Sequence, residues 1–572
     1  MTKSKTSKIF FGAFLALVFC VSLLAGCTGN DDTTGGSEKQ SQSTDSAVSQ
    51  SDANSNAEPE ADGLINKEGL PIVNDPVEYE IITLQMSTLR TANEKPVTVW
   101  AEEETGVKIN WTEIPEASYD EKVNILFASD SLPDAICGKV HILSAFYNQL
   151  IDLNPYMDEY APTTTAFFAE RPDYPQAYSG ADGALKMLPI GDESLGNTVD
   201  TQLWLNQDWL TNLNLEMPKT TEEFEAVMKA FKEQDANGNG DPNDEIPFTF
   251  KDVWGWAKGI ENFMGAFGVV ENNQHVFLSP DDNKTVVFGA EEQGYYDFLK
   301  WMNNLYTQGL IDPEVFTHSD DQYYTKNSGK DVIGAYLEYL DGGLGSAVSS
   351  HDQEDQKFKF CEALTGPDGD QYVGLNNLVR EAGLMITDKC ENPEVLVRWY
   401  DWANTDLETF ARFRWGVEGE VWQFAENEAG ELVPQLIDLP LDSDYEQFGY
   451  QNGGEYAGAV CFSGWSPAMA TDAKLALMPP EVDRDRKRPA AVIDVQHGIN
   501  PLPQGIADPE NEDQRSLIRA DLDNYLLRFI SDSIINGIDD AKWERHLGEL
   551  EKLRVPEYKQ LCQEFVDDIQ SR

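Results

Sequence analysis

The chain has 572 residues, of which 41% are hydrophobic and 11% aromatic, so we expect at least two folded domains and exclude wholesale disorder. Asp and Glu outnumber Lys and Arg by 100 to 42, which gives a formal net charge of −58. This charge excludes a general nucleic-acid-binding protein and argues against charge-driven docking on anionic lipid. Six His and seven Cys are too few and too scattered for a zinc ribbon or a disulfide scaffold.

The first residues have the features of an export signal. Three lysines (Lys3, Lys5 and Lys8) precede the uncharged, apolar segment Ile9–Leu24. That segment is shorter than the roughly 20 residues that a transmembrane helix needs, and it suits the core of a signal peptide. Leu24-Ala25-Gly26-Cys27 follows directly and resembles a bacterial lipobox.

Cleavage before Cys27 would make this cysteine the first residue, with lipid on its thiol. We therefore predict a lipoprotein signal peptide at residues 1–26. An ordinary secretory signal with a chance cysteine and a retained membrane helix are the alternatives. Removal of residues 1–26, which contain three Lys and no acidic residue, would leave 546 residues with a net charge of −61.

A polar segment follows the lipobox. Thr28–Asp62 consists mainly of Ser, Thr, Asp, Asn, Gly and Glu, with Val48 as its single large aliphatic residue and no aromatic residue. Such a composition cannot bury a core, and as a flexible coil it would span roughly 30–35 Å. We expect residues 27–74 to form the lipidated cysteine and a disordered tether.

The remainder is expected to be mixed α/β. Tyr79–Leu84 is typical of a strand, and Val107, Ile109 and Trp111 alternate with polar residues as a half-buried strand does. Thr220-Thr221-Glu222-Glu223 predicts a capping box at a helix start, and Asn392-Pro393-Glu394 predicts an N-cap with Pro at the first helical position.

Three helices are predicted to close the chain. Their apolar stripes recur at helical spacing, which favours core positions over ligand contacts. The stripes comprise Leu522, Tyr525, Leu526, Phe529, Ile530 and Ile534 in the first helix, ended by Gly537; Trp543, Leu547 and Leu550 in the second; and Tyr558, Leu561, Cys562, Phe565 and Ile569 in the third.

Five cysteines would remain besides the lipidated one: Cys137, Cys361, Cys390, Cys461 and Cys562. Five is an odd number and none are near neighbours in the sequence. We expect free buried thiols, with a single disulfide as the alternative.

Residues 235–245 form the clearest chemical motif. Asp235, Asn237 and Asn239 place oxygen side chains at positions 1, 3 and 5, with Gly240 at position 6, as in the first half of an EF-hand loop. Asp241 would add its carbonyl oxygen, and Asp244 and Glu245 would complete the ligands of a structural Ca²⁺ ion. Position 12 is Ile246 instead of Glu, so the loop is not a full EF-hand. The alternative is an Asn/Asp/Gly-rich turn that needs no metal.

No catalytic motif is recognisable. The chain lacks a Gly-x-Ser-x-Gly elbow, a His-Glu-x-x-His motif and a phosphate loop, and its six histidines stand alone. Paired carboxylates of a glycosidase have no sequence signature here, since no acidic residue stands out. We expect a protein that is not an enzyme.

Several segments, in order, resemble the extracellular solute-binding proteins of bacterial ABC importers. More specifically, they resemble the lipoprotein subfamily that includes the alginate-oligosaccharide-binding and LipO-like proteins, from about residue 80 to the end. The matching segments are Glu104-Thr105-Gly106-Val107, residues 128–134 (ASDSLPD), Asp208-Trp209-Leu210, residues 218–224 (PKTTEEF), Gly309-Leu310-Ile311-Asp312-Pro313 and residues 414–420 (RWGVEGE). The calcium-like loop and Ile246-Pro247 also follow the family order, although the loop is one residue longer than usual.

The resemblance implies a two-lobed α/β fold of the periplasmic-binding-protein type II, with hinge strands and a C-terminal helical segment. It implies lobe 1 at residues 75–185 plus 355–400 and lobe 2 at 186–354 plus 401–572, which contains the calcium-like loop. It also implies a lipid-anchored monomer on the extracellular face of the bacterial cytoplasmic membrane. This protein would capture an oligosaccharide between its lobes and deliver it to ABC permease subunits.

Ligand contacts are expected from aromatic faces and from polar groups at strand ends. The aromatic candidates outside helical stripes are Trp254, Trp256, Trp415, Trp422 and Trp465. The polar candidates are Ser87 and Arg90 after the first strand and Asp134 after the second, with Tyr336, Arg414 and Glu418 as weaker additions. Each tryptophan is equally compatible with packing, and Arg414 and Glu418 with a simple ion pair.

The net charge favours a neutral or weakly charged oligosaccharide over a polyanion such as alginate, because a −61 body repels anions at long range. The alternatives are a binding protein for a peptide or another solute, a surface carbohydrate-active enzyme, and a structural lipoprotein without a cleft.

Overall fold

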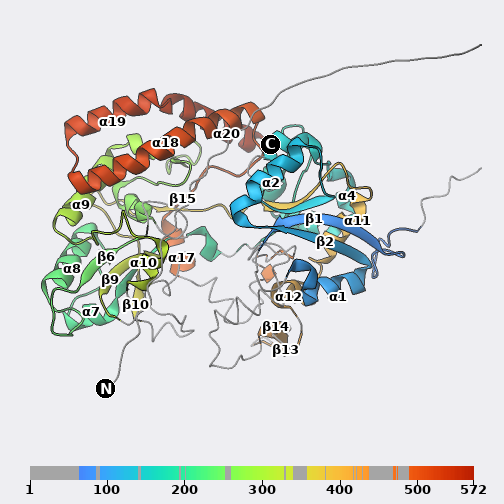
Figure 1. Ribbon diagram of the computed structural model, residues 1–572, viewed down its shortest axis with the longest axis horizontal. Coiled ribbons are helices and arrows are strands. Elements are labelled where there is room, and N and C mark those ends of the chain that lie inside the picture. Colours follow the sequence, from blue (N-terminus) through green and yellow to red (C-terminus); the bar gives the residue numbers. More distant parts are fainter. Residues whose placement is uncertain are drawn as a thin grey trace, which may run out of the picture. The chain divides into compact units, whose positions relative to one another are not determined.

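The computed structural model describes residues 63–572, apart from 86–90, 140–142, 192, 194, 200, 252–258, 327–329, 339–356, 380–381, 417, 420–421, 428–429, 437–467, 470, 472 and 475–488. The chain divides into two units after Glu60, and the described residues all belong to the second. This unit contains two main β-sheets, each with its own hydrophobic core (Figure 1). The expected mixed α/β class is confirmed.

Five strands form the first sheet: β1 (Val77–Leu84), β2 (Val107–Ile114), β3 (Ala135–Lys139), β4 (Leu188–Pro189) and β12 (Ala382–Ile386). Their order is β2-β1-β3-β12-β4, with β1 parallel to β2 and β3 and with β12 antiparallel to its neighbours. The expected alternation is present, since Val107, Ile109 and Trp111 are buried and the residues between them are half-buried. This sheet therefore carries β12 from a distant part of the chain.

Two helices make the parallel connections of this sheet. α1 (Pro96–Thr105) joins β1 to β2, and α2 (Glu116–Ala128) joins β2 to β3. α1 ends at Gly106, whose φ of 71° lies in the left-handed region that favours glycine. The other helices associated with this sheet are α3 (Leu143–Phe146), α4 (Asn154–Tyr160), α5 (Pro162–Glu170), α6 (Asp173–Tyr178), α11 (Pro393–Trp402) and α12 (Leu407–Trp415). Asn392 and Pro393 begin α11 as expected, although Asn392 makes no side-chain cap.

Four strands form the second sheet: β5 (Gln202–Asn206), β6 (Ile246–Thr249), β9 (Ile333–Glu338) and β10 (Phe358–Cys361). Their order is β10-β5-β9-β6. β6 is parallel to β9, whereas β5 is antiparallel to both β9 and β10. The carboxyl ends of β6 and β9 therefore share an edge of the sheet with the amino end of β5.

The helix that precedes the calcium-like loop begins where the sequence predicts. In α8 (Thr221–Glu233), the Thr220 hydroxyl accepts a hydrogen bond from the Glu223 N–H at 3.1 Å. The Glu223 carboxylate accepts from the N–H of Lys219 at 2.7 Å, one residue before the N-cap. The cap is thus confirmed, with its reciprocal bond shifted by one residue. The other helices of this half, apart from the last three, are α7 (Gln207–Asn212), α9 (Gln293–Thr307) and α10 (Asp320–Thr325).

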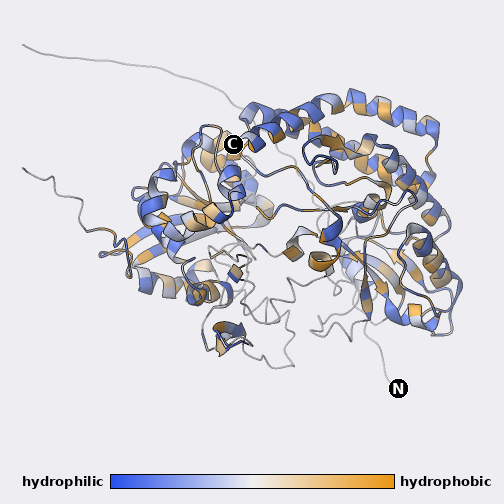
Figure 2. Cartoon of the chain, turned by 180° about the vertical axis from the view of Figure 1, so that it is seen from behind, coloured by the Kyte–Doolittle hydropathy of each residue, from blue (hydrophilic) through white to orange (hydrophobic). Residues whose placement is uncertain are grey.

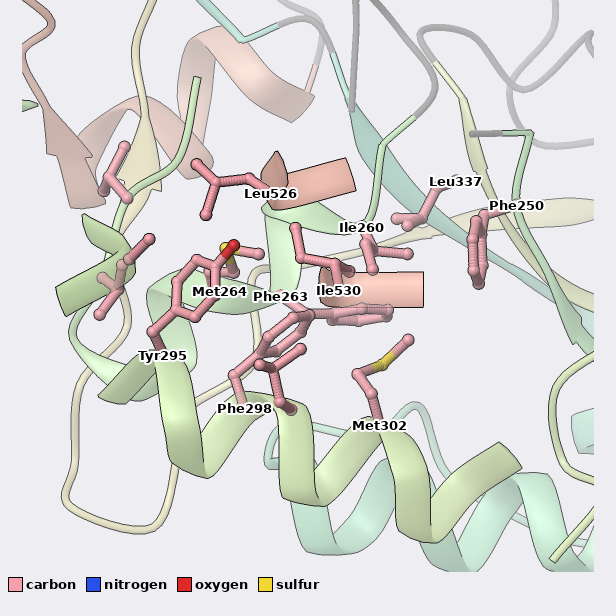
Figure 3. Close-up of a cluster of buried hydrophobic side chains, with 14 of the residues drawn as sticks. Phe250, Ile260, Phe263, Met264, Tyr295, Phe298, Met302, Leu337, Leu526 and Ile530 are labelled. Atoms are coloured by element: carbon pink, nitrogen blue, oxygen red, sulfur yellow. The ribbon is translucent and has the colours of Figure 1, made fainter. Parts of the chain in front are cut away.

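The three predicted C-terminal helices are present as α18 (Pro509–Asn536), α19 (Asp540–Lys552) and α20 (Val555–Ser571), and Gly537 ends the first. Hydrophobic and hydrophilic residues alternate along them (Figure 2). Leu526 and Ile530 of α18 are fully buried in the same hydrophobic cluster as Phe298 and Met302 of α9 (Figure 3). The C-terminal helices therefore complete the second core.

The remaining elements are short. They are β7 (Val276–Leu278) paired with β8 (Val286–Phe288), β11 (Val373–Gly374) paired with β15 (Gly498–Ile499), β13 (Trp422–Glu426) paired with β14 (Leu432–Leu436), α17 (Pro489–Val492), and the 3-10 helices η1 (Ala92–Glu94), η2 (Tyr147–Gln149), η3 (Leu195–Thr198), η4 (Ile260–Phe267), η5 (Gly289–Glu291) and η7 (Asp494–His497).

The chain passes between the two cores three times, and the three passages contact one another. Val199, Ala363, Val373 and Ala490, which come from these passages, form a small separate hydrophobic cluster. Backbone hydrogen bonds join the same segments, from the Asn376 N–H to the Thr198 carbonyl at 2.7 Å and from the Leu375 N–H to the Ile499 carbonyl at 3.0 Å. These are the contacts expected of hinge segments in a two-lobed protein.

Three segments differ from the sequence-based boundaries. Residues 63–74, expected in the tether, pack against the first core, where Ile72 and Val73 are almost completely buried. β10 pairs with β5 in the second sheet, and Phe413 of α12 packs in the first core. Burial of Ile72 and Val73 fixes the first of these segments, strand pairing places β10 in the second sheet, and helix packing places α12 in the first core.

The cysteines also differ in part from expectation. Cys361, Cys390 and Cys562 are free thiols, whereas Cys137 in β3 is disulfide-bonded, as the single-disulfide alternative allowed. Spacing in the sequence gave no indication of this pair. Among the described residues, no helix combines the length and apolar character needed to cross a membrane.

Candidate functional site

The carboxyl edge of the first sheet holds a compact polar segment directly after the expected ligand loop. Asn93 is held against β2 by two hydrogen bonds. Its side-chain amide donates to the Trp111 carbonyl at 2.9 Å and accepts from the Trp111 N–H at 2.7 Å. The Glu113 carboxylate accepts from the Ala92 N–H at 2.9 Å, while its other oxygen is buried without a hydrogen-bond partner. Burial lowers the pKa of Lys95 to about 8, an effect that the nearby Glu113 opposes.

Ser87 and Arg90, the polar residues predicted for this edge, lie outside the described residues. They belong to the segment between Gln85, whose N–H donates to the Ile114 carbonyl, and the clamped residues Ala92 and Asn93. The chain on both sides of them is therefore anchored at the carboxyl ends of β1 and β2.

Asp134 was expected at the same edge and lies at the opposite one. It directly precedes β3, and its carboxylate accepts from the N–H of Glu80, near the start of β1, at 2.8 Å. Its backbone carbonyl accepts from the Thr387 N–H at 2.9 Å. Its expected position at the carboxyl edge is wrong, because α2 returns the chain to the amino end of the parallel strands before β3 begins.

Two of the aromatic candidates are internal. Trp422 is fully buried, and its indole N–H donates to the Gly416 carbonyl at 2.8 Å. Tyr336 lies in β9, where it is fully buried and packs edge-on against Phe358, with ring centroids 4.9 Å apart. Neither ring exposes a face to solvent in this structure.

The other candidates give a mixed result. Trp254, Trp256 and Trp465 lie outside the described residues, and Trp415 is the last residue of α12. Glu418 is paired with Arg412 at 3.3 Å. Arg414 has its own contacts and is half-buried. These residues therefore stay predicted ligand contacts.

The second sheet places four polar or aromatic residues at its carboxyl edge that the sequence analysis did not single out. We call Gln202, Lys251, Tyr324 and Glu338 the edge cluster. The Lys251 ammonium donates to the Tyr324 hydroxyl at 3.2 Å and lies 4.5 Å from the ring centroid. The Tyr324 hydroxyl donates to the Glu338 carboxylate at 3.4 Å. In the backbone register of β5 and β9, Gln202 stands opposite Glu338.

These residues come from four separate segments, so no local motif marks them. Three of them could have been found by their position at strand ends. Gln202 begins β5, Glu338 ends β9 and Lys251 follows β6 by two residues. Ligands of open α/β sheets collect at the carboxyl ends of parallel strands.

The calcium-like loop is folded back on itself by its own side chains. Asp235 accepts from the Gly240 N–H at 2.9 Å, and Asn237 and Asn239 accept from the N–H groups of Asn239 and Asp241 at 3.0 and 2.7 Å. Asp244 accepts from the side-chain amides of Asn237 and Asn239 at 3.1 and 2.8 Å, and Glu245 accepts from the Ala236 N–H at 3.1 Å. All six predicted ligands therefore belong to one closed loop.

One observation favours a cation in this loop. One oxygen of Asp235 and one of Glu245 are buried and have no hydrogen-bond partner. Buried carboxylate oxygens without partners are costly, and Ca²⁺ is bound by oxygen ligands of this kind. Among the described residues, no group of three or more His, Cys, Asp or Glu has the geometry of a metal site. Any metal would thus depend on the Asn oxygens and a backbone carbonyl as well.

Comparison with known proteins gives consistent matches. The family model described as bacterial extracellular solute-binding protein matches residues 85–406. The fructooligosaccharide ABC transporter substrate-binding protein FusA of Streptococcus pneumoniae is 30% identical over 498 residues, covering 84% of this chain and 88% of FusA. Lipoprotein LipO of Bacillus subtilis is 29% identical over 290 residues, covering 47% of this chain and 52% of LipO.

Solved structures of FusA confirm the fold. The complex of FusA with kestose matches with a TM-score of 0.69 and 26% identity, covering 87% of this chain and all of FusA. An EF-hand mutant of FusA in complex with fructo-nystose matches with a TM-score of 0.67 and 25% identity, over the same shares of the two chains. The structural neighbours are two-lobed solute-binding proteins, so the expected two-lobed fold is confirmed.

Proposed function

The chain belongs to the bacterial extracellular solute-binding proteins, and from this premise we propose that it is the lipid-anchored oligosaccharide-binding component of an ABC importer. The observation that carries this proposal is the likeness to FusA over 84% of the chain, since FusA is a fructooligosaccharide-binding protein. The relatives are binding proteins, which agrees with the expectation of a function without catalysis.

We propose an uncharged or weakly charged oligosaccharide as the ligand. With a net charge of −58 before processing, the protein repels anionic ligands at long range. A sugar needs aromatic faces for its C–H surface and planar polar groups for its hydroxyls. The carboxyl edges of both sheets supply polar groups of this kind, at Glu113 and in the edge cluster.

Capture is proposed to work by closure of two lobes. We place one lobe around the first sheet and its core, and the other around the second sheet with the C-terminal helices. A ligand that touches both sheet edges would favour the closed state, because only that state gains both sets of contacts. The three crossing segments joined by Val199, Ala363, Val373 and Ala490 would serve as the hinge, and the permease would recognise the closed form.

We propose a structural Ca²⁺ ion in the loop after α8. Asp235, Asn237 and Asn239 would bind it by side-chain oxygens, Asp241 by its carbonyl, and Asp244 and Glu245 by their carboxylates. The ion would supply positive charge that offsets the buried carboxylate oxygens. No nucleophile or general base was recognised near the loop, so its role would be to hold the end of α8 and the start of β6.

The anchor is proposed to be lipid on Cys27, which would keep a monomeric protein at the extracellular face of the cytoplasmic membrane. Mass spectrometry of the mature protein tests this directly. The expected result is a chain that begins at Cys27 and carries acyl chains, whereas an unmodified first residue at any other position would contradict it.

A thermal-shift screen of the mature chain tests the function. The panel contains kestose, nystose, an alginate trisaccharide and a tripeptide mixture. Kestose or nystose should raise the melting temperature in a concentration-dependent way without being cleaved. A shift with peptides alone would indicate a different solute-binding protein, and cleavage of the sugar would indicate an enzyme.

The same screen with a chelator tests the calcium proposal. Removal of Ca²⁺ should lower the melting temperature, and Ca²⁺ but not Mg²⁺ should restore it, because Ca²⁺ tolerates irregular coordination by six to eight oxygens. An unchanged melting temperature after chelation would leave the loop as a turn without metal. Asp235→Asn and Glu245→Gln should remove the response to Ca²⁺ by replacing the partnerless carboxylates.

A further inference from the structure

The amino end of β5 contains an unusual concentration of buried polar atoms without partners. Gln202 is fully buried, and neither its side-chain oxygen nor its side-chain nitrogen has a hydrogen-bond partner. The neighbouring Thr201 is 3% exposed, and its hydroxyl also lacks a partner. Three such atoms on consecutive residues need an explanation, because a buried polar group that has lost its water and gained no partner destabilises the fold.

The backbone around these atoms is fully engaged, so they do not result from a loosely formed strand. Gln202 pairs with Glu338, and the next residue, Leu203, pairs with Leu337. The Asn262 amide donates to the Thr201 carbonyl at 2.8 Å, and the Trp204 indole donates to the Glu338 carbonyl at 3.1 Å. The strand is therefore fixed in place while its first side chains lack partners.

The rest of the edge cluster is organised around one exposed ring. Tyr324 is 42% exposed, whereas Lys251 and Glu338 are 8% and 7% exposed and both contact its hydroxyl. Lys251 and Glu338 carry opposite charges, so together they add no net charge. An exposed ring held by a neutral pair beside an amide with open hydrogen-bonding capacity matches a sugar, which has a C–H face and hydroxyls at its edge.

We infer that the edge cluster is a subsite for one uncharged sugar ring of the ligand. The Gln202 amide donates to one ring hydroxyl and accepts from a second, and the Tyr324 ring lies against the C–H face. Lys251 and Glu338 hold the tyrosine in position. This inference rests on the proposed oligosaccharide-binding function. It identifies Gln202 and Tyr324 as the residues of the second half that contact the ligand.

The test uses Gln202→Met, which keeps the length of the side chain and removes the amide. If the amide reads the ligand, the variant should bind kestose about tenfold or more weakly while its melting temperature without ligand stays equal or rises, because two partnerless polar atoms are removed. Gln149→Met is the matched control, since the Gln149 amide donates to the Phe127 carbonyl at 3.0 Å near the first core. This control should lose stability and keep its affinity for kestose.

Tyr324 supplies a second arm of the test. Tyr324→Ala should weaken kestose binding about tenfold, and Tyr324→Phe, which keeps the ring, should retain most of the affinity. Wild-type affinity in both Gln202→Met and Tyr324→Ala would overturn the subsite and leave the proposed function in place. If the wild-type chain binds neither kestose, nor nystose, nor any other uncharged oligosaccharide, both the subsite and the proposed function are overturned.

Discussion

A buried histidine, His275, connects helix α18 to the second core. Its charge should make the stability of this region depend on pH. The imidazole of His275 is fully buried between two carboxylates, with Nδ1 2.5 Å from Glu271 and Nε2 2.7 Å from Asp523 of α18. Burial lowers the pKa of His275, but the two carboxylates outweigh burial and raise this pKa to about 9.

The direction of the pH effect follows from this shift. The pKa in the folded state lies above the unfolded value of about 6.5, so the charged imidazole stabilises the fold fully below pH 6.5. That contribution is lost as the pH rises through 9. At 1.36 kcal/mol per pKa unit, the difference corresponds to at most about 3 kcal/mol between pH 7 and pH 10, and the exposure of Asp523 reduces it.

The matched variant is His275→Asn. His275 has a φ of 58°, and asparagine tolerates this left-handed backbone better than other uncharged residues. Urea unfolding of both proteins at pH 7 and pH 10 isolates the histidine, because all other titrating groups are shared. The wild type should have a higher free energy of unfolding than the variant, and this difference should be about 2–3 kcal/mol larger at pH 7 than at pH 10. Equal pH dependence in the two proteins would refute a stabilising role for a charged His275 between Glu271 and Asp523.

Two further predictions concern single positions. Burial raises the pKa of Asp494 to about 7, so its stabilising contribution is complete below pH 3.8 and lost as the pH rises through 7. Asp494→Asn, which can still accept from the Ala363 N–H, should therefore raise the free energy of unfolding by about 2 kcal/mol more at pH 8 than at pH 5. An equal effect at both pH values would refute this. Thr220→Ala removes the cap of α8 and should lower the free energy of unfolding by about 1 kcal/mol in urea titration, whereas no loss would show that the Glu223 N–H finds another acceptor.

The elements that could be predicted from the sequence are those with local causes. The alternation in β2 follows from its position with one face on the core, and α8 begins at Thr220 because the hydroxyl satisfies a backbone N–H that the helix leaves open. The calcium-like loop also follows from local sequence, since its oxygen side chains and glycines lie within residues 235–245. In each case the interacting groups are less than about a dozen residues apart.

The misplaced residues depend on contacts between distant segments. Asp134 was assigned to the wrong edge because the start of β3 is set by pairing with β1, more than 50 residues earlier in the chain. β12 enters the first sheet more than 240 residues after β3, and no local pattern indicates its partner. Trp422 and Tyr336 have the residue types of sugar-binding platforms, yet core packing buries both.

The edge cluster could not be found from the sequence for the same reason. Its residues come from four segments between Gln202 and Glu338. The pairing of β5, β6 and β9 and the contact of α10 with β9 bring them together. The amide of Gln202 differs from other glutamines in the sequence only through what surrounds it. Burial without a partner is a property of the folded chain and has no sequence signature.

Isothermal titration calorimetry of the mature, calcium-loaded chain with kestose tests the central claim most directly. The account predicts saturable binding of one sugar per chain, with the trisaccharide recovered intact. Absence of binding heat with kestose, nystose and other uncharged oligosaccharides over a range of temperatures, together with saturable binding of a peptide or an anionic solute, would contradict it.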